Sequence, residues 1–159
     1  NGDRPVVFAN RGVSGIDGNI ATVAGAAFGA KRPITAILGD LAALHDLNSL
    51  ALLRETCAPV VLVVLNNDGG GIFHFLPVTA HEEAFEPYFA TPHGLTFESA
   101  AGMFGVVYAK PDSLAGFRDE YVAALERSHA TLIEIRTNRA ENAVLHEAID
   151  AQVLDALRA

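Results

Sequence analysis

The chain has 159 residues, half of them hydrophobic, and a formal net charge of -8 with a sequence pI of about 5.1. This length and apolar content suit one core of ordinary size, so we expect residues 1–159 to form a single domain. The acidic balance argues against nucleic acid as a partner. No apolar run reaches the ~20 residues that span a bilayer, and one cysteine cannot form an internal disulfide. We therefore predict a cytoplasmic protein without membrane insertion.

The first third of the chain alternates between short apolar runs and helical patterns. Val6–Ala9 predicts a strand, which a glycine-rich loop and then a helix ending near Ala30 follow. Ile34–Leu38 predicts the second strand. Leucines at helical spacing from about Ala42 to Thr56 predict the next helix.

Val60–Leu65 is a run of six branched apolar residues, which is typical of a central strand covered on both faces. Further patterns predict helices over 96–103 and 113–127, strands over 106–108 and 131–135, and a final helix from about Glu141. Strands that alternate with helices predict an α/β fold, a doubly wound parallel sheet with helices on both faces. Ligands of such sheets bind at the carboxyl ends of the strands.

Two predicted strands end in loops rich in glycine, aspartate and asparagine. Gly39 and Asp40 follow one strand, and Asn66–Gly71 follows the next. Magnesium prefers carboxylate, amide and phosphate oxygens, and glycines let backbone groups approach a diphosphate closely. Taken alone, each loop favours a simpler interpretation: Asp40 as a helix N-cap, and a plain turn over 66–71. Their pairing at neighbouring strand ends favours a joint site.

The order Gly-Asp, then a helix and a strand, then Asn-Asn resembles the signature of the thiamine diphosphate enzymes. The separation between Asp40 and Asn67 agrees with the spacing in that family. The resemblance implies that Asp40, Asn67 and the backbone carbonyl of Gly69 hold Mg²⁺, or Mn²⁺ in its place, on the cofactor diphosphate. The chain departs from the family pattern at Leu41, where most members have a second glycine.

That departure points to one branch of the family. Residues 10–18, 39–48 and 66–73 together resemble the synthases of menaquinone biosynthesis that decarboxylate 2-oxoglutarate and add the succinyl carbanion equivalent to isochorismate. In that branch the activating glutamate belongs to a pyrimidine-binding domain, of the same or a neighbouring subunit in a homo-oligomer. The chain shows no candidate for this glutamate and opens without methionine. We expect it to be the C-terminal piece of a longer chain and inactive alone.

The resemblance also implies roles for single side chains. Ile16 would force the cofactor rings into a bent form, and Arg11 would bind a substrate carboxylate. The apolar side of the substrate pocket would consist of Ile72, Phe73 and Leu76. Further cofactor contacts would come from Ser14, Gly39, Leu41 and Gly70.

Each role has an alternative. Ile16 also suits a core position at the start of a helix. Arg11 could be a solvated charge in a loop. Residues 72–76 could be a helical turn that packs on the sheet. The six histidines receive no role, because no pair combines metal-ligand spacing with a partner. Two other functions stay open: another thiamine diphosphate 2-oxo acid decarboxylase or acetolactate-type synthase, and a non-catalytic diphosphate-binding module.

Overall fold

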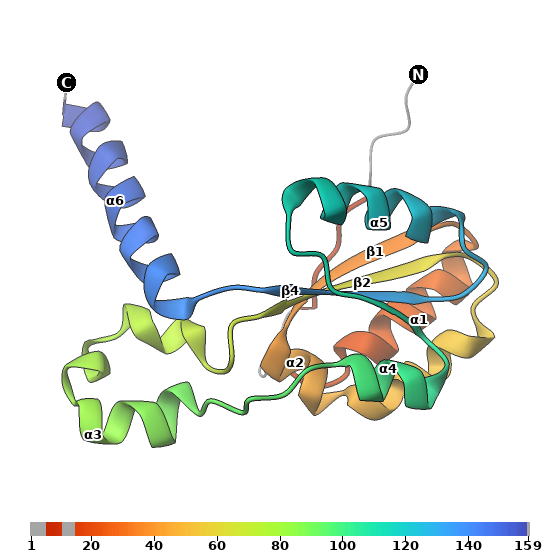
Figure 1. The fold of residues 1–159 in the computed structure, drawn as a ribbon. Coiled ribbons are helices and arrows are strands. Elements are labelled where there is room, and N and C mark those ends of the chain that lie inside the picture. The colour runs from red at the N-terminus through yellow and green to blue at the C-terminus, as the bar shows by residue number, and fades with distance from the viewer. Residues whose placement is uncertain (1–5, 11–14, 159) are drawn as a thin grey trace.

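A computed structural model describes residues 6–10 and 15–158. Its centre is a parallel sheet of four strands in the order β1-β2-β4-β3 (Figure 1). The strands are β1 Ile34–Gly39, β2 Val60–Asn66, β3 Val107–Ala109 and β4 Thr131–Arg136. Ile34 pairs with Val60, and Val61 pairs with Thr131, so the three longer strands end at one edge of the sheet.

Helices cover both faces of this sheet, as the sequence predicts. One face packs against α1 Asn19–Ala30, α2 Asp40–His45, the 3-10 helix η1 Leu47–Glu55 and α4 Glu98–Phe104. The opposite face packs against α5 Leu114–Glu126. The chain crosses the sheet in one direction from β1 to β3 and then turns back to β4. Right-handed crossovers therefore place α5 on the face opposite to the earlier helices.

Strand β2 is the centre of the core. Val60, Leu62 and Val64 point to the face with α1, whereas Val61 and Val63 point to the face with α5. Full burial of each such side chain stabilises the fold by about 1.5–3 kcal/mol. The prediction of a central strand covered on both faces is confirmed.

The helix predicted from Ala42 to Thr56 is two elements. The α-helix ends at His45, and a 3-10 helix continues from Leu47. Between them Asp46 is buried, and its carboxylate accepts hydrogen bonds from the Ala21 N–H and the Ser49 hydroxyl. The break therefore exists because this carboxylate ties the turn to α1. Sequence periodicity alone does not report such a contact.

The strand predicted at Val6–Ala9 is wrong. Residues 6–10 form no strand, and Val7 is 87% exposed. An apolar run becomes a strand only where a neighbouring strand pairs with it or a covered face receives its side chains. The only strand that pairs with β1 among the described residues is β2, so residues 6–10 have no strand to pair with. The side chain of Ile37 on β1 is exposed, so this part of β1 offers no covered face either.

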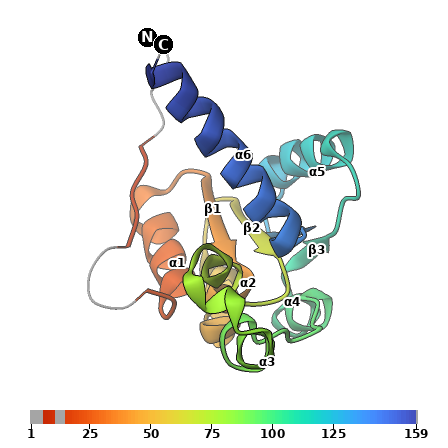
Figure 2. The same cartoon turned by 90° about the vertical axis from the view of Figure 1, so that its left-hand side faces the viewer.

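The chain leaves the sheet in a region that we call the arm, residues 71–90 together with α6 (Figures 1 and 2). The first part contains η2 Gly71–Phe75, η3 Pro77–Ala80, α3 Glu82–Phe85 and the π-helical turn η4 Glu86–Ala90. The second part is α6 Arg139–Arg158, which has no buried residue over its length. Within residues 6–10 and 15–158, no helix is long and apolar enough to cross a membrane. Short connections, residues 67–70 and 137–138, join the arm to the ends of β2 and β4.

Candidate cofactor and metal site

Asp40 joins the carboxyl ends of β1 and β2. It is the first residue of α2, it is 2% exposed, and Gly39 rather than Asp40 occupies the N-cap. Asp40 Oδ2 accepts a hydrogen bond of 2.8 Å from the Gly69 N–H, and Oδ1 accepts one of 2.8 Å from the Leu41 N–H. The simpler interpretation of Asp40 as an N-cap therefore does not describe this carboxylate. The structure does bring it to the loop after β2, residues 66–71, which we call the glycine loop.

Asn67 carries the most informative atom of the glycine loop. Its Oδ1 is buried and has no hydrogen-bond partner among the described residues. An unpaired buried acceptor costs about 1–3 kcal/mol, so a protein retains one mainly where a ligand completes it. The amide oxygen is a hard ligand of the kind that Mg²⁺ prefers. The donor chemistry of Asn67 and Asp40 thus fits a divalent cation.

Ionisable side chains do not cluster into a metal site in the described part of the chain. The described residues contain no group of three or more His, Cys, Asp or Glu side chains that could hold a metal ion. Magnesium commonly takes one or two protein ligands and completes its octahedron with phosphate oxygens and water. One carboxylate and one amide oxygen at neighbouring strand ends are compatible with a cation whose other ligands come from phosphate oxygens and water.

The glycines at the ends of β1 and β2 differ in whether the packing of the chain requires a residue without a side chain. At Gly69, φ is +122° and a Cβ would overlap the carbonyl oxygen of Ala90; at Gly70, a Cβ would overlap that of Phe89. Close packing against η4 thus requires both glycines. At Gly39 φ is -76° and a Cβ would meet no atom within 4 Å, so the chain itself does not require glycine there. Space for a closer neighbour therefore exists at Gly39, next to the Asp40 carboxylate.

His93 lies beside Asp40, although no pattern in the sequence assigned it a role. Its Nε2 lies 3.0 Å from Asp40 Oδ2, and its Nδ1 accepts a hydrogen bond of 3.0 Å from the Leu95 N–H. Because Nδ1 is an acceptor, the ring proton is on Nε2 and is donated to Asp40. Asp40 Oδ2 thus has two donors, His93 and Gly69, which leaves Oδ1 as the oxygen with spare capacity. His93 and Asp40 are 53 positions apart in the chain, so no local periodicity of the sequence could have indicated their contact.

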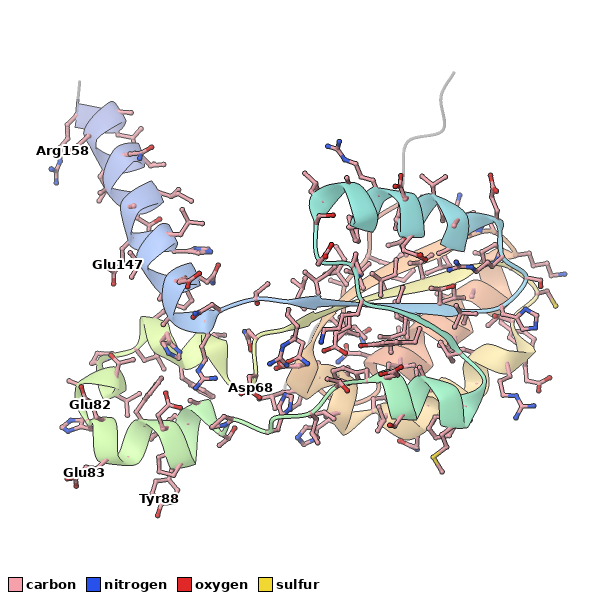
Figure 3. The ribbon with its side chains drawn as sticks, viewed as in Figure 1. Asp68, Glu82, Glu83, Tyr88, Glu147 and Arg158 are labelled. Carbon is pink, nitrogen blue, oxygen red and sulfur yellow. The ribbon has the colours of Figure 1, made fainter. Side chains whose placement is uncertain are left out.

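Asp68 ties the glycine loop to the loop that carries His93. Its φ of +63° is left-handed, and its Oδ1 accepts hydrogen bonds from the Gly94 N–H at 2.7 Å and the His93 N–H at 3.1 Å. The bond from Gly94 is the main reason that the pKa of Asp68 is lowered, and partial burial opposes it. Figure 3 shows Asp68 where the sheet meets the arm.

A buried carboxylate anchors the same loops from inside the core. Glu134 on β4 is fully buried and accepts hydrogen bonds from Asn66 Nδ2 at 2.8 Å, and from the Phe97 N–H and the Tyr108 hydroxyl at 2.9 Å each. Asn66 Oδ1 in turn accepts a bond from the Asp68 N–H. The start of the glycine loop is therefore fixed by a core residue that the sequence did not single out.

The residues expected to bind substrate lie in η2 and just after it. Ile72 is 73% exposed and Leu76 is also exposed, so they do not pack on the sheet as the alternative interpretation required. Phe73 is half-buried and forms an edge contact with Phe89, with ring centroids 5.8 Å apart. Ile16 lies in the bend before α1 and is exposed, so it is not the core residue of its alternative interpretation.

Two expected site residues cannot be placed. Arg11 and Ser14 lie outside the described residues. The roles expected for them stay predictions, as do those of Ile16, Leu41 and the η2 side chains.

Comparison with known proteins gives a family and a set of relatives. Residues 3–135 match the family model described as thiamine pyrophosphate enzyme, C-terminal TPP binding domain. The chain is 54% identical over 146 residues to the 2-succinyl-5-enolpyruvyl-6-hydroxy-3-cyclohexene-1-carboxylate synthase of Salinibacter ruber, covering 92% of this chain and 24% of the relative. It is 57% identical over 143 residues to the synthase of the same name from Rubrobacter xylanophilus, covering 90% and 25%. The chain thus spans about a quarter of the length of the curated relatives it matches.

Solved structures show the same fold. The thiamine diphosphate-dependent 4-hydroxybenzoylformate decarboxylase of Rhodococcus jostii superposes with a TM-score of 0.66 at 26% identity, over 76% of this chain and 23% of that one. The benzoylformate decarboxylase of Polynucleobacter necessarius gives 0.62 at 19% identity, over the same shares. The second likeness shows the fold alone.

Proposed function

The chain belongs to the thiamine pyrophosphate enzymes, in which it corresponds to the C-terminal cofactor-binding domain, and from this we propose that it anchors thiamine diphosphate through Mg²⁺ in a carboligase. The observation that carries the proposal is the buried Oδ1 of Asn67, which has no partner among the described residues. Asp40, Asn67 and the carbonyl of Gly69 are the proposed metal ligands, and Mn²⁺ can replace Mg²⁺. No atom lies where a Cβ of Gly39 would be, which supports close approach of a diphosphate to Gly39, and Leu41 and Gly70 are the further proposed cofactor contacts.

The bound cofactor supplies the carbanion chemistry, and the residues of this chain supply position. His93 and the Gly69 N–H both donate to Asp40 Oδ2, which orients the carboxylate so that Oδ1, whose one donor is the Leu41 N–H, keeps a lone pair for the metal. Asp68 fixes the glycine loop against the loop at 93–94 through two backbone donors. Such preorganisation lowers the entropic cost of assembling a metal site.

The proposed substrates are 2-oxoglutarate and isochorismate, in menaquinone biosynthesis. This step rests on the name shared by relatives that are 54% and 57% identical to the chain, and on the sequence blocks at 10–18, 39–48 and 66–73. Arg11 is the proposed ligand of a substrate carboxylate, and Ile72, Phe73 and Leu76 the apolar side of the pocket. Ile16 and Ser14 are assigned to the cofactor itself.

A thiamine diphosphate decarboxylase is the second candidate, because one such enzyme shares the fold at 26% identity. The identity to the synthases is about twice as high over a larger share of the chain, which favours the synthase. In either case the carboxylate that activates the cofactor would come from a pyrimidine-binding domain of the same or a neighbouring subunit. We therefore propose that the working enzyme is a homo-oligomer and that this chain alone does not turn over.

The proposal is tested by titrating the chain calorimetrically with thiamine diphosphate in Mg²⁺ and in a chelator, with unphosphorylated thiamine as the control ligand. We expect binding only for the diphosphate and only with the metal. Equal affinity in the chelator would refute the metal-bridged anchor.

A second assay supplies 2-oxoglutarate and isochorismate and follows the release of carbon dioxide. Turnover by this chain at the rate of a multidomain synthase would refute the separate activating domain.

A further inference from the structure

Helix α6 begins at a fixed place beside the glycine loop. Asn138 precedes it, and its Oδ1 accepts hydrogen bonds from the N–H groups of Ala140 at 2.9 Å and Glu141 at 3.2 Å. In return, Glu141 Oε1 accepts a hydrogen bond of 3.1 Å from Asn138 Nδ2. This reciprocal cap is a helix start signal, and it explains why α6 begins at Arg139 instead of at the predicted Glu141. The first residue of α6 therefore has a defined position.

That first residue is a cation in a place where helix stability disfavours one. The amino end of a helix carries partial positive charge, so acidic side chains are preferred in its first turn. The side chain of Arg139 is also only 16% exposed, so solvation does not explain its position either. Its presence has to be explained by its partners.

The partners of Arg139 are the glycine loop and the arm. Nη1 donates to the carbonyl oxygen of Asp68 at 2.7 Å and lies 3.5 Å from that of Asn67. Nη2 donates to Glu86 Oε2 at 2.6 Å, which holds the guanidinium from the opposite side. A planar guanidinium with several fixed donors suits this bridging, whereas a lysine offers one point charge.

These bonds determine which oxygens of the loop remain free. The carbonyls of Asn67 and Asp68 are turned toward Arg139, and that of Asn66 accepts a bond from the Thr137 N–H. The left-handed backbone of Asp68, unfavourable for a residue with a side chain, is held in the same way. The two loop oxygens assigned to the metal are not bound by Arg139: the side-chain oxygen of Asn67 has no partner among the described residues, and the Gly69 carbonyl accepts only from the Gly71 N–H.

We infer that Arg139 is a positioning residue for the cofactor site: by binding the carbonyls of Asn67 and Asp68, it holds the glycine loop in its metal-binding conformation. The inference rests on the proposed function and deepens it, because it assigns part of the site to α6. This helix lies beyond residues 3–135, the part that matches the family model. Figure 3 shows the base of α6 next to Asp68.

The test compares three variants of the chain by calorimetric titration with thiamine diphosphate and Mg²⁺, and by the paramagnetic resonance spectrum of Mn²⁺ bound with thiamine diphosphate. Arg139→Met removes the donors and keeps the apolar stem. Arg139→Lys keeps the charge but replaces the planar guanidinium by a single ammonium nitrogen. Arg158→Met is the matched control at the other end of α6, where the arginine is 76% exposed.

We expect Arg139→Met to raise the Kd for the cofactor about tenfold and to alter the Mn²⁺ spectrum, as loss of a charge-assisted hydrogen bond to the loop should. Arg139→Lys should raise the Kd only about threefold, and Arg158→Met should leave both unchanged. Unchanged Kd and spectrum in Arg139→Met would overturn the inference. A change in the apparent affinity for substrate alone, measured in a multidomain enzyme that contains this domain, would also overturn the inference. If Arg139→Met does not fold, Arg139→Lys decides, and an unchanged Kd in it is the contrary result.

The outcome is separable from the proposed function. If the unmodified chain shows no metal-dependent binding of thiamine diphosphate, the proposed function fails before any variant is compared. If the unmodified chain binds and Arg139→Met binds equally well, only the inference about Arg139 fails.

Discussion

The sheet and the arm are built on different interactions. In β2, Val60, Leu62 and Val64 are completely buried, whereas α6 has no buried residue and its Leu157 is 79% exposed. The sheet is stabilised by apolar burial. In the arm only Phe85 and Ala90 are buried, and directed contacts join its base to the sheet, such as the bond from the Gly70 N–H to the Ala90 carbonyl at 2.7 Å. Because the candidate site lies at their junction, its geometry depends on both.

The largest expected difference between the two regions is the loss of unfolding free energy when a leucine is replaced by alanine. Leu62→Ala should lower the free energy of unfolding by about 2–5 kcal/mol, because it leaves a cavity in the core. The matched change Leu157→Ala in α6 should stay within about 0.5 kcal/mol. Urea unfolding of both variants measures this. Similar losses at the two positions would mean that Leu157 is buried, contrary to its exposure in α6.

Next in size is the effect of Glu134, the polar link between the core and the site. Glu134→Gln places an amide NH₂ where three donors converge, so at least one of them loses its acceptor. An unpaired buried donor costs about 1–3 kcal/mol, which is the expected loss in unfolding free energy. Glu147→Gln on exposed α6 is the control and should change little. If both variants unfolded alike in urea, Glu134 would not anchor the loops.

An effect of similar size is expected where the sheet and the arm touch. Gly69→Ala should cost about 1–3 kcal/mol, because the residue has a positive φ and its new Cβ would overlap the Ala90 carbonyl. Gly102→Ala in α4 meets open space and should stabilise the fold by about 0.5–1 kcal/mol. Thermal unfolding monitored by circular dichroism compares them. A neutral Gly69→Ala would mean that η4 does not pack closely on the glycine loop.

The smallest effect is a dependence on alkaline pH. Burial and the hydrogen bond to Glu134 raise the pKa of Tyr108. Because the folded-state pKa is the higher one, this contribution to stability is complete below the unfolded pKa of about 10 and is lost as pH rises through the folded value. Ultraviolet titration should show one tyrosine that ionises late. Tyr108→Phe should remove that late signal, and removal of an early signal instead would contradict the assignment.

Local sequence patterns predicted most of the sheet. Val60–Leu65 is buried on both faces, and in such a strand composition alone indicates the environment. The pattern at Val6–Ala9 failed because a strand also needs a pairing partner, which no local pattern reports. The same reason explains Asp46, whose contact with α1 broke a predicted helix.

The site was predictable only in part, for a related reason. Asp40 and Asn67 follow strands directly, so their positions at one sheet edge follow from the parallel order. His93 and Arg139 reach the site from loops and helices far along the chain, and only the fold pairs them with Asp40 and Asp68. For Arg139 one signal existed: a cation next to the capping pair Asn138 and Glu141 is misplaced for helix stability. Such a misplaced charge indicates a partner outside the helix.

The central claim is that Asn67 keeps its buried oxygen unpaired in order to bind the cofactor metal, and Asn67→Leu tests it most directly. Thiamine diphosphate with Mg²⁺ should raise the melting temperature of the unmodified chain by mass action. Asn67→Leu should lose this shift, yet melt no lower than the unmodified chain without cofactor, because it removes an unpaired buried acceptor. Asn48→Leu, exposed in η1, is the control that should keep the shift. A full cofactor-induced shift in Asn67→Leu would contradict the claim.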